Sequence, residues 1–198
     1  NEVAPLVTEF NALLDRLRIQ RAHIAGISYG GEISLTFALR YPARTLSLFV
    51  ADVVSQVDSA LATIIAAWRD AATRRDPDLF FNVTTPYNFS PAWMRANTAA
   101  LTQAHERYQR LDFPAVARLL TCFLDLSLSE RLPEIKAPTC VVVGEKDILK
   151  PRDYGQLIAD AIPGAELHLI RDAGHATFWE RPAEFNSILL GFLKKHSK

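Results

Sequence analysis

One serine in this chain has the neighbours that a catalytic nucleophile needs. The segment Gly26-Ile27-Ser28-Tyr29-Gly30 has the spacing Gly-x-Ser-x-Gly and joins a short apolar run to a helical pattern. A serine at such a strand-to-helix corner lies on a sharp, strained turn that raises its oxygen above the edge of a sheet. Because Gly26 and Gly30 lack side chains, we expect strand and helix to approach closely there. Ser28 is therefore the candidate nucleophile, and a glycine-rich turn with an incidental serine is the alternative.

An aspartate and a histidine follow two later predicted strands. Asp147 comes three residues after the β-branched run 139–144, and His175 follows the apolar run 165–170 on the next such loop. The carboxyl ends of parallel strands meet at one edge of a sheet, where ligands bind. A histidine oriented by a carboxylate accepts the proton of a serine and passes it to a leaving group. The order Ser28, Asp147, His175 therefore predicts acyl transfer by a catalytic triad.

The hydrophobic pattern predicts an α/β fold, in which a mostly parallel sheet is flanked by helices. We expect strands at 23–26, 46–54, 139–144 and 165–170, and helices at 6–17, 32–40 and 184–195. Residues 58–129 contain no clear strand, and their apolar spacing predicts helices at 60–74, 91–110 and 114–128. Residues 1–57 and 130–198 therefore form the predicted core, with an all-helical insertion at 58–129.

The sequence resembles the α/β-hydrolase superfamily from about residue 9 to its end, least clearly between residues 58 and 129. The resemblance rests on Gly26-Ile27-Ser28-Tyr29-Gly30-Gly31, Gly144-Glu145-Lys146-Asp147, Ala173-Gly174-His175 and Phe178-Trp179-Glu180-Arg181-Pro182. It implies that Ser28 is the nucleophile, Asp147 the triad acid and His175 the general base. It also implies that the N–H of Tyr29 is one donor of the oxyanion hole and that residues 58–129 are a helical cap over the active site.

The beginning of the chain departs from that family's pattern. In the family, a loop well before the nucleophile supplies the second oxyanion donor. Here only about twenty residues precede the nucleophile strand, position 1 is Asn, and no His-Gly-type sequence lies upstream of Ser28. We therefore expect an N-terminally truncated α/β-hydrolase fold. If the chain is complete, we predict weak or absent turnover, because losing one oxyanion donor slows such enzymes by about a hundred- to a thousandfold.

Further residues are candidates for the site. Asp52 competes with Asp147 for the place of the triad acid; we favour Asp147 because it leaves its strand on a loop, whereas Asp52 lies inside a strand-like run. Glu180, close to Pro182, is most simply a residue at the start of a helix. Aromatic residues could line a substrate pocket, although aromatics at helical spacing more often form plain core. The candidates for substrate binding are Phe81, Trp93, Phe123 and Trp179.

Composition excludes several classes of partner and cofactor. The 22 basic and 22 acidic side chains give a net charge of zero, so no field steers the chain to nucleic acid or to an anionic membrane. No apolar stretch approaches the ~20 residues of a membrane span, and no signal peptide is visible. Cys122 and Cys140 lie in apolar runs and are expected to be buried thiols, and no histidine has metal-ligand spacing. We therefore expect a cytoplasmic protein that needs no metal or organic cofactor.

These observations predict a serine hydrolase that cleaves a carboxylic ester, lactone or thioester of a small to medium apolar acyl group through an acyl-enzyme. Its partner is then a small-molecule acyl substrate. A serine at position 28 argues against dehalogenase chemistry, for which the family resemblance would place aspartate there. One alternative is an acyltransferase that uses the same triad. The other is a non-catalytic hydrolase-fold binding protein or an inert fragment. The oligomeric state stays open, with the missing N-terminal segment or a second chain as possible partners.

Overall fold

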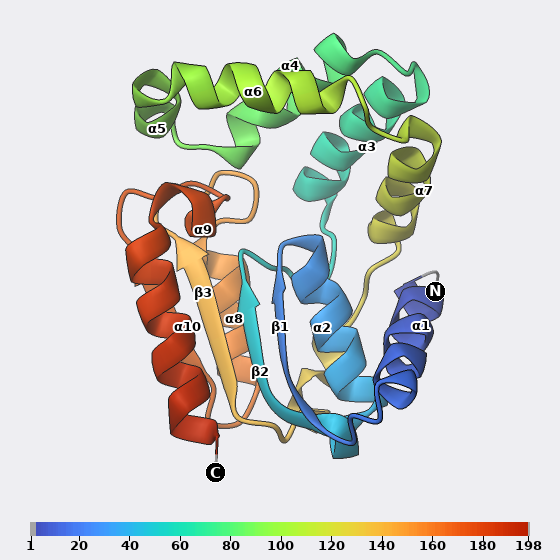
Figure 1. Ribbon diagram of the computed structural model, residues 1–198, viewed down its shortest axis with the longest axis vertical. Helices are drawn as coiled ribbons and strands as arrows, with labels where there is room; N and C mark the ends of the chain where they lie inside the picture. The colour runs from blue at the N-terminus through green and yellow to red at the C-terminus, as the bar shows by residue number, and fades with distance from the viewer. Residues whose placement is uncertain (1–2, 198) are drawn as a thin grey trace.

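Four parallel strands form one sheet in the computed structural model, which describes residues 3–197 (Figure 1). The strands are β1 (Ala22–Ile27), β2 (Thr45–Ala51), β3 (Thr139–Gly144) and β4 (Glu166–Ile170), and they are neighbours in that order. Each neighbouring pair is parallel. The predicted α/β fold with a parallel sheet is therefore confirmed. Parallel strands leave the sheet at a common edge, so the loops after β1, β3 and β4 meet there.

Helices cover both faces of the sheet, because its inner strands are apolar on both sides. Every residue of β3 is buried, as is typical of an interior parallel strand. On one face, α2 (Tyr29–Arg40) and α8 (Arg152–Ala161) enclose a large apolar cluster, and α1 (Val3–Arg16) packs beside α2. On the other face, α10 (Pro182–His196) packs its buried phenylalanines on the sheet. Cys122 and Cys140 are buried thiols, as predicted.

Five helices connect β2 to β3 and lie beyond the carboxyl edge of the sheet (Figure 1). They are α3 (Ser59–Thr73), α4 (Pro77–Asn88), α5 (Pro91–Ala96), α6 (Thr98–Tyr108) and α7 (Phe113–Leu124). The sequence pattern predicts α3 and α7 but gives no separate helix for α4. Shorter helices are η1 (Pro42–Arg44), η2 (Ser129–Glu134) and α9 (Thr177–Glu180), the last directly after the loop of His175.

The prediction of one helix over residues 91–110 is wrong, because the helix breaks at Asn97. This residue has φ −127° and ψ 42°, outside the helical region. Its side-chain Nδ2 donates to the carbonyl of Trp93 at 2.9 Å, where its own backbone N–H would bond in a continuous helix. Asparagine competes with helices in this way through local hydrogen bonds to the backbone. The chain therefore changes direction between α5 and α6.

The two segments that join the sheet to these helices run side by side. The N–H of Val57 donates to the carbonyl of Leu126 at 3.2 Å, and the N–H of Leu128 donates to the carbonyl of Ser55 at 2.7 Å. The hydroxyls of Ser55 and Ser129 lie 2.7 Å apart. The chain therefore enters and leaves the helical segment through two hydrogen-bonded stretches of backbone, residues 55–57 and 126–129, which we call the paired neck.

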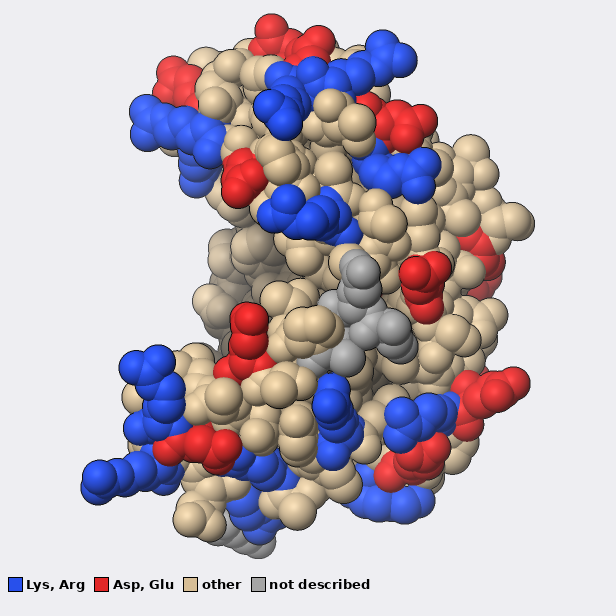
Figure 2. Space-filling model, turned by 90° about the vertical axis from the view of Figure 1, so that its right-hand side faces the viewer, with Lys and Arg blue, Asp and Glu red and all other residues tan. Residues whose placement is uncertain are grey.

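Charged side chains of both signs are interspersed on the surface. Figure 2 shows a face where lysine and arginine alternate with aspartate and glutamate, and where the outline is hollowed between the upper helices and the body below. This pattern agrees with a net charge of zero. Among residues 3–197 we find no helix with the length and hydropathy that crossing a bilayer requires.

Candidate active site

Ser28 lies on a sharp turn directly after β1. Its φ is 50°, a left-handed value that is strained for a residue with a side chain. Its N–H donates to the carbonyl of Ala51 at 2.8 Å, and its carbonyl accepts the N–H of Gly31 at 2.7 Å. Both β2 and α2 therefore fix the turn. The strained strand-to-helix corner expected at Ser28 is confirmed.

Glycine lets α2 pack closely against β1. A Cβ at Gly26 would lie 2.1 Å from the carbonyl oxygen of Gly30, and a Cβ at Gly31 would lie 2.1 Å from Cγ1 of Val53. A Cβ at Gly30 would meet nothing within 4 Å. The expectation for Gly30 is therefore wrong, because its carbonyl, and not its missing side chain, makes the close contact. The second glycine that the packing requires is Gly31.

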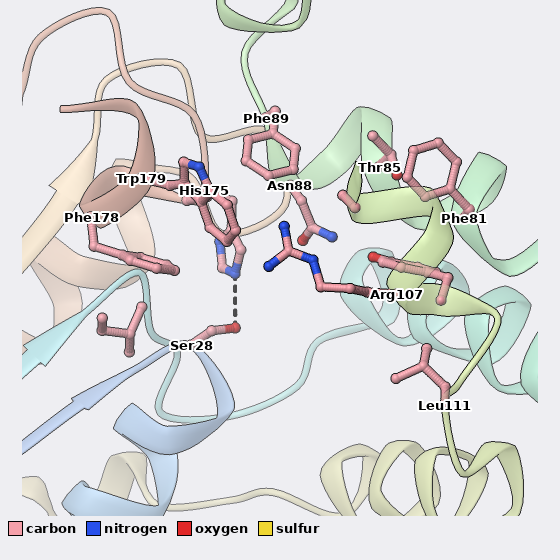
Figure 3. Close-up of a pocket in the computed structure, with 14 residues that line it drawn as sticks. Ser28, Phe81, Thr85, Asn88, Phe89, Arg107, Leu111, His175, Phe178 and Trp179 are labelled. Atoms are coloured by element: carbon pink, nitrogen blue, oxygen red, sulfur yellow. Dashed lines mark hydrogen bonds between the residues drawn. The ribbon is translucent and has the colours of Figure 1, made fainter. Parts of the chain in front are cut away.

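The structure brings Asp147 and His175 to Ser28. Nε2 of His175 lies 2.8 Å from Oγ of Ser28, the contact drawn in Figure 3, and Nδ1 lies 2.8 Å from Oδ2 of Asp147. The His175 and Asp147 side chains are only 6% and 0% exposed, so water does not compete strongly for these bonds. A neutral imidazole that donates from Nδ1 to the carboxylate leaves Nε2 as an acceptor for the serine proton. This geometry suits general-base activation of the hydroxyl.

Two loops are packed together to hold this arrangement. A Cβ at Gly144 would lie 2.2 Å from the carbonyl oxygen of Gly174, so the end of β3 touches the loop of His175. Oδ1 of Asp147 accepts the backbone N–H groups of Leu149 and Lys150 at 2.9 and 2.8 Å. These bonds leave the other carboxylate oxygen directed at the imidazole.

Asp52 lies next to this network but makes different contacts. β2 ends at Ala51, and Asp52 has φ 55°, so its expected place inside a strand is wrong. Its carboxylate accepts Thr177 Oγ1 at 2.6 Å and the N–H of Gly144 at 3.2 Å. Burial, and then the negative charge of Asp147, raise the pKa of Asp52 well above its ordinary value. The imidazole of His175 is hydrogen-bonded to Asp147 instead.

A buried ion pair that the sequence motifs did not single out also reaches Ser28. Nζ of Lys150 donates to Oε1 of Glu32 at 2.8 Å and to Oγ of Ser28 at 3.3 Å. The two charged side chains are 2% and 0% exposed. Glu32 lies in the first turn of α2, four residues after Ser28, and Lys150 lies three residues after Asp147. The only sequence signal is that each charge lies close to a motif residue, and this does not show that the two side chains meet.

Two cavities meet at Ser28. The first, of about 390 Å³, contains both Ser28 and His175 and is mostly apolar. Arg107 points into it, as Figure 3 shows, and its guanidinium lies over the ring of Trp179 at 5.4 Å. The other lining residues that the structure describes are Ile27, Phe81, Thr85, Asn88, Phe89, Ala104, Tyr108, Leu111, Ala176, Phe178 and Trp179.

The second cavity, of about 200 Å³, lies between α3 and α7 on the other side of Ser28. Its polar floor is formed by Ser28 and Lys150, and its walls are apolar. They include Tyr29, Ile65, Trp68, Val116, Leu119, Leu120, Phe123 and Leu149. Of the four aromatic candidates, Phe81 and Trp179 therefore line the first cavity and Phe123 the second. Trp93 lines neither and stacks on Phe89, with ring centroids 4.5 Å apart.

Glu180 connects the helical segment to the loop of His175. One carboxylate oxygen accepts the N–H of Ser90 at 2.8 Å and the other accepts its hydroxyl at 2.6 Å. Ser90 is the N-cap of α5, and its Oγ also accepts the N–H of Trp93 at 3.2 Å. Glu180 is only 7% exposed, so it acts as a buried link and not simply as a residue at a helix start.

The residues that the structure describes contain no group of three or more side chains suited to hold a metal ion. The groups in direct hydrogen-bond contact around Ser28 are its hydroxyl, the imidazole of His175, the carboxylates of Asp147 and Glu32, and the ammonium of Lys150. This donor set fits nucleophilic chemistry at a carbonyl, with proton transfer through His175.

Comparison with known proteins identifies the family. Residues 2–188 match the family model described as "Alpha/beta hydrolase family". The chain belongs to this family. The hydrolase fold and enzyme class that the motifs predict are thereby confirmed, and several similar proteins are named as hydrolases.

Three of these similar proteins show the range of the family. RutD of Azorhizobium caulinodans, a proposed carbamate hydrolase, is 27% identical over 193 residues, covering 96% of this chain and 72% of the relative. The 2-hydroxy-6-oxo-6-phenylhexa-2,4-dienoate hydrolase of Comamonas testosteroni is 28% identical over 194 residues, covering 92% of this chain and 66% of the relative. The crystal structure of MGS-M2, an alpha/beta hydrolase from a Medee basin deep-sea metagenome library, superposes with a TM-score of 0.91 at 30% identity, covering 95% of this chain and 70% of that one.

Proposed function

We propose that this α/β-hydrolase cleaves a carboxylic ester, lactone or thioester through an acyl-enzyme on Ser28. The observation that carries the proposal is the pair of 2.8 Å contacts of His175, one to Oγ of Ser28 and one to Asp147. Named hydrolases among its relatives support carbonyl chemistry of this class.

Acylation begins when His175 takes the proton of Ser28. Oγ bonds to the substrate carbonyl carbon, and the electron pair of the carbonyl bond moves to its oxygen. The first N–H groups of α2, with that of Tyr29 as one donor, stabilise the resulting oxyanion. His175 then gives the proton to the leaving group, and a water molecule, deprotonated by the same imidazole, releases the acyl group.

The two cavities divide the substrate between them. His175 must reach the leaving-group atom, so the first cavity takes the leaving group, beside Phe81 and Trp179 and within reach of the Arg107 guanidinium. The second cavity takes the acyl group, against Phe123. Its apolar walls favour a small to medium hydrocarbon chain. Trp93 acts behind Phe89, whose ring it supports.

Residues 58–129 form the cap in this proposal, and residues 1–57 and 130–198 form the catalytic core. The paired neck between Ser55 and Ser129 supports this division. The cap's helices supply one wall of each cavity, so substrate selection belongs to the cap and proton transfer to the core.

Hydrolysis of p-nitrophenyl esters by the purified chain tests the proposal. Ser28→Ala and His175→Ala should each abolish turnover above the level of the uncatalysed reaction, while the thermal unfolding transition stays cooperative. Activity that survives in Ser28→Ala would contradict the proposal. Absence of ester binding, of turnover and of fluorophosphonate labelling at Ser28 would together favour a non-catalytic role. Acyl transfer to an added alcohol in preference to water would favour the acyltransferase alternative.

A further inference from the structure

A buried cation contacts the nucleophile, which the proton relay of serine, histidine and aspartate does not require. Nζ of Lys150 lies 3.3 Å from Oγ of Ser28 and 2.8 Å from Oε1 of Glu32. The same ammonium lies 4.9 Å from the centre of the Phe123 ring, which offers it a cation–π contact. Lys150 is therefore held on three sides, and one of them is the reacting oxygen.

Stability alone does not explain this pair. Taking two charges out of water costs several kcal/mol per ion, and replacing a buried pair by uncharged side chains of similar volume is often neutral or stabilising. Burial disfavours the charged form of Glu32: desolvation raises its pKa even though the neighbouring Lys150 acts to lower it. Its Oε2 has no hydrogen-bond partner among the residues that the structure describes. A costly pair directed at a nucleophile calls for a role at that nucleophile.

The contacts of Ser28 leave room for this role. A hydroxyl has one proton and two lone pairs. The proton of Ser28 faces Nε2 of His175, and a lone pair accepts from the ammonium of Lys150. Both hydrogen bonds can therefore exist at once. Lys150 acts as the donor here, because its Nζ donates both to Oγ of Ser28 and to Oε1 of Glu32.

We propose that Lys150 is a catalytic residue that stabilises the negative charge developing on Oγ of Ser28, with Glu32 as its positioning residue. The proposal rests on the proposed function. In acylation, the proton of Oγ passes to His175 while the bond from Oγ to the carbonyl carbon is still incomplete, so Oγ carries partial negative charge. In deacylation, that bond breaks, its electron pair stays on Oγ, and His175 returns the proton taken from water. The proton of Lys150 stays in place throughout.

Glu32 sets the position of the ammonium. Oε1 of Glu32 also accepts the N–H of Val54 at 2.9 Å, so the carboxylate is anchored to the loop after β2. The backbone N–H of Lys150 is meanwhile bonded to Asp147. One residue thus fixes the triad acid through its backbone and polarises the nucleophile through its side chain.

The test measures how fast a fluorophosphonate probe phosphonylates Ser28, with loss of fluoride, in the double variant Glu32→Gln with Lys150→Met. Glutamine keeps an acceptor for the N–H of Val54, and because both charges are removed together, no buried charge is left without its partner. A charge-assisted hydrogen bond to the reacting atom corresponds to a rate loss of about 10- to 100-fold. The matched control is Glu166→Gln with Lys195→Met, which removes a surface ion pair between β4 and α10 and should leave the rate unchanged.

The outcomes separate the two proposals. Labelling of the wild type and the control with slow labelling of a folded double variant supports the role of Lys150. Equal labelling of all three overturns it and leaves the proposed function standing. A wild type that does not label at Ser28 overturns both.

If the double variant does not fold, a second pair of single variants tests the same proposal. Lys150→Arg keeps the positive charge, and Lys150→Gln keeps a donor without charge. We expect the arginine variant to label at least about tenfold faster than the glutamine variant. Equal rates in the two folded variants would overturn the proposal.

Discussion

Asp147 and Asp52 are both buried carboxylates within reach of the same loops, and their partners decide their roles. Asp147 offers one oxygen to His175 because two backbone N–H groups hold the other. The two carboxylate oxygens of Asp52 accept hydrogen bonds from the hydroxyl of Thr177 and from the N–H of Gly144. Neither of these bonds involves the imidazole, whereas a triad acid must accept the histidine N–H to stabilise the imidazolium.

Asparagine substitutions at these two positions should therefore differ. Asp147→Asn should lower kcat for ester hydrolysis by about 10⁴-fold, because an amide stabilises the wrong tautomer of the histidine. Asp52→Asn is the matched control and should keep kcat within about tenfold, since it has no contact with the imidazole. Steady-state kinetics of the two variants decide this. A larger loss in Asp52→Asn than in Asp147→Asn would assign the acid to Asp52.

The residues of the proton relay could be predicted from the sequence, but their electrostatic neighbours could not. Ser28 directly follows β1, Asp147 comes three residues after β3 and His175 five residues after β4, and parallel strands bring such positions to one edge. Lys150 and Glu32 meet because the side chain of Lys150 turns inward from the loop of Asp147 and that of Glu32 turns inward from α2. Patterns of spacing carry no information on that path.

At the scale of elements, the helices beyond the carboxyl edge of the sheet are attached at particular points to α9 and to the loop that carries His175. Glu180 of α9 holds the start of α5 through Ser90, and the N–H of Ala176 donates to the carbonyl of Asn88 at 2.8 Å. Ala176 directly follows His175 in the chain. The end of α4 and the start of α5 are thus fixed to the loop that carries the imidazole.

Glu180→Gln should weaken that attachment. The amide keeps one acceptor oxygen and loses the charge, so the free energy of unfolding should fall by about 1.5–3 kcal/mol. Urea unfolding measures it. The matched control is Glu106→Gln on the exposed face of α6, where the change should stay within about 0.5 kcal/mol. Equal losses in the two variants would show that the buried link contributes nothing specific.

The sequence predicted the strands better than the helices between them. β3 begins and ends where expected, since proline and a closing glycine delimit its β-branched run. The break at Asn97 was missed because the apolar spacing continues across it, and only the local side-chain bond to Trp93 reveals it. The predicted strand over residues 46–54 is longer than β2. Val53 and Val54 continue its apolar pattern, but the backbone turns away at Asp52.

At the scale of the whole molecule, one sheet edge collects titratable groups that are costly to bury, and this should affect the dependence of stability on pH. Desolvation raises the pKa of Asp52, so the folded chain binds more protons than the unfolded chain above the ordinary carboxyl pKa. The stability that this group contributes is therefore present at low pH and is lost as pH rises through the folded pKa. Glu32 acts in the same direction.

Asp52→Asn removes that titration. From about pH 4 upward, its free energy of unfolding should fall less steeply with pH than that of the wild type. Urea unfolding at a series of pH values measures both curves. Parallel curves would contradict the raised pKa.

The central claim is that Ser28 becomes acylated by virtue of its contact with His175. Mass spectrometry of the chain after reaction with a fluorophosphonate tests this most directly, because the probe phosphonylates the same oxygen that a substrate would acylate and the adduct locates it. We predict one adduct, on the peptide that contains Ser28, which disappears in Ser28→Ala and forms much more slowly in His175→Ala. An adduct on another residue, or equal labelling of Ser28 with and without His175, would contradict the account.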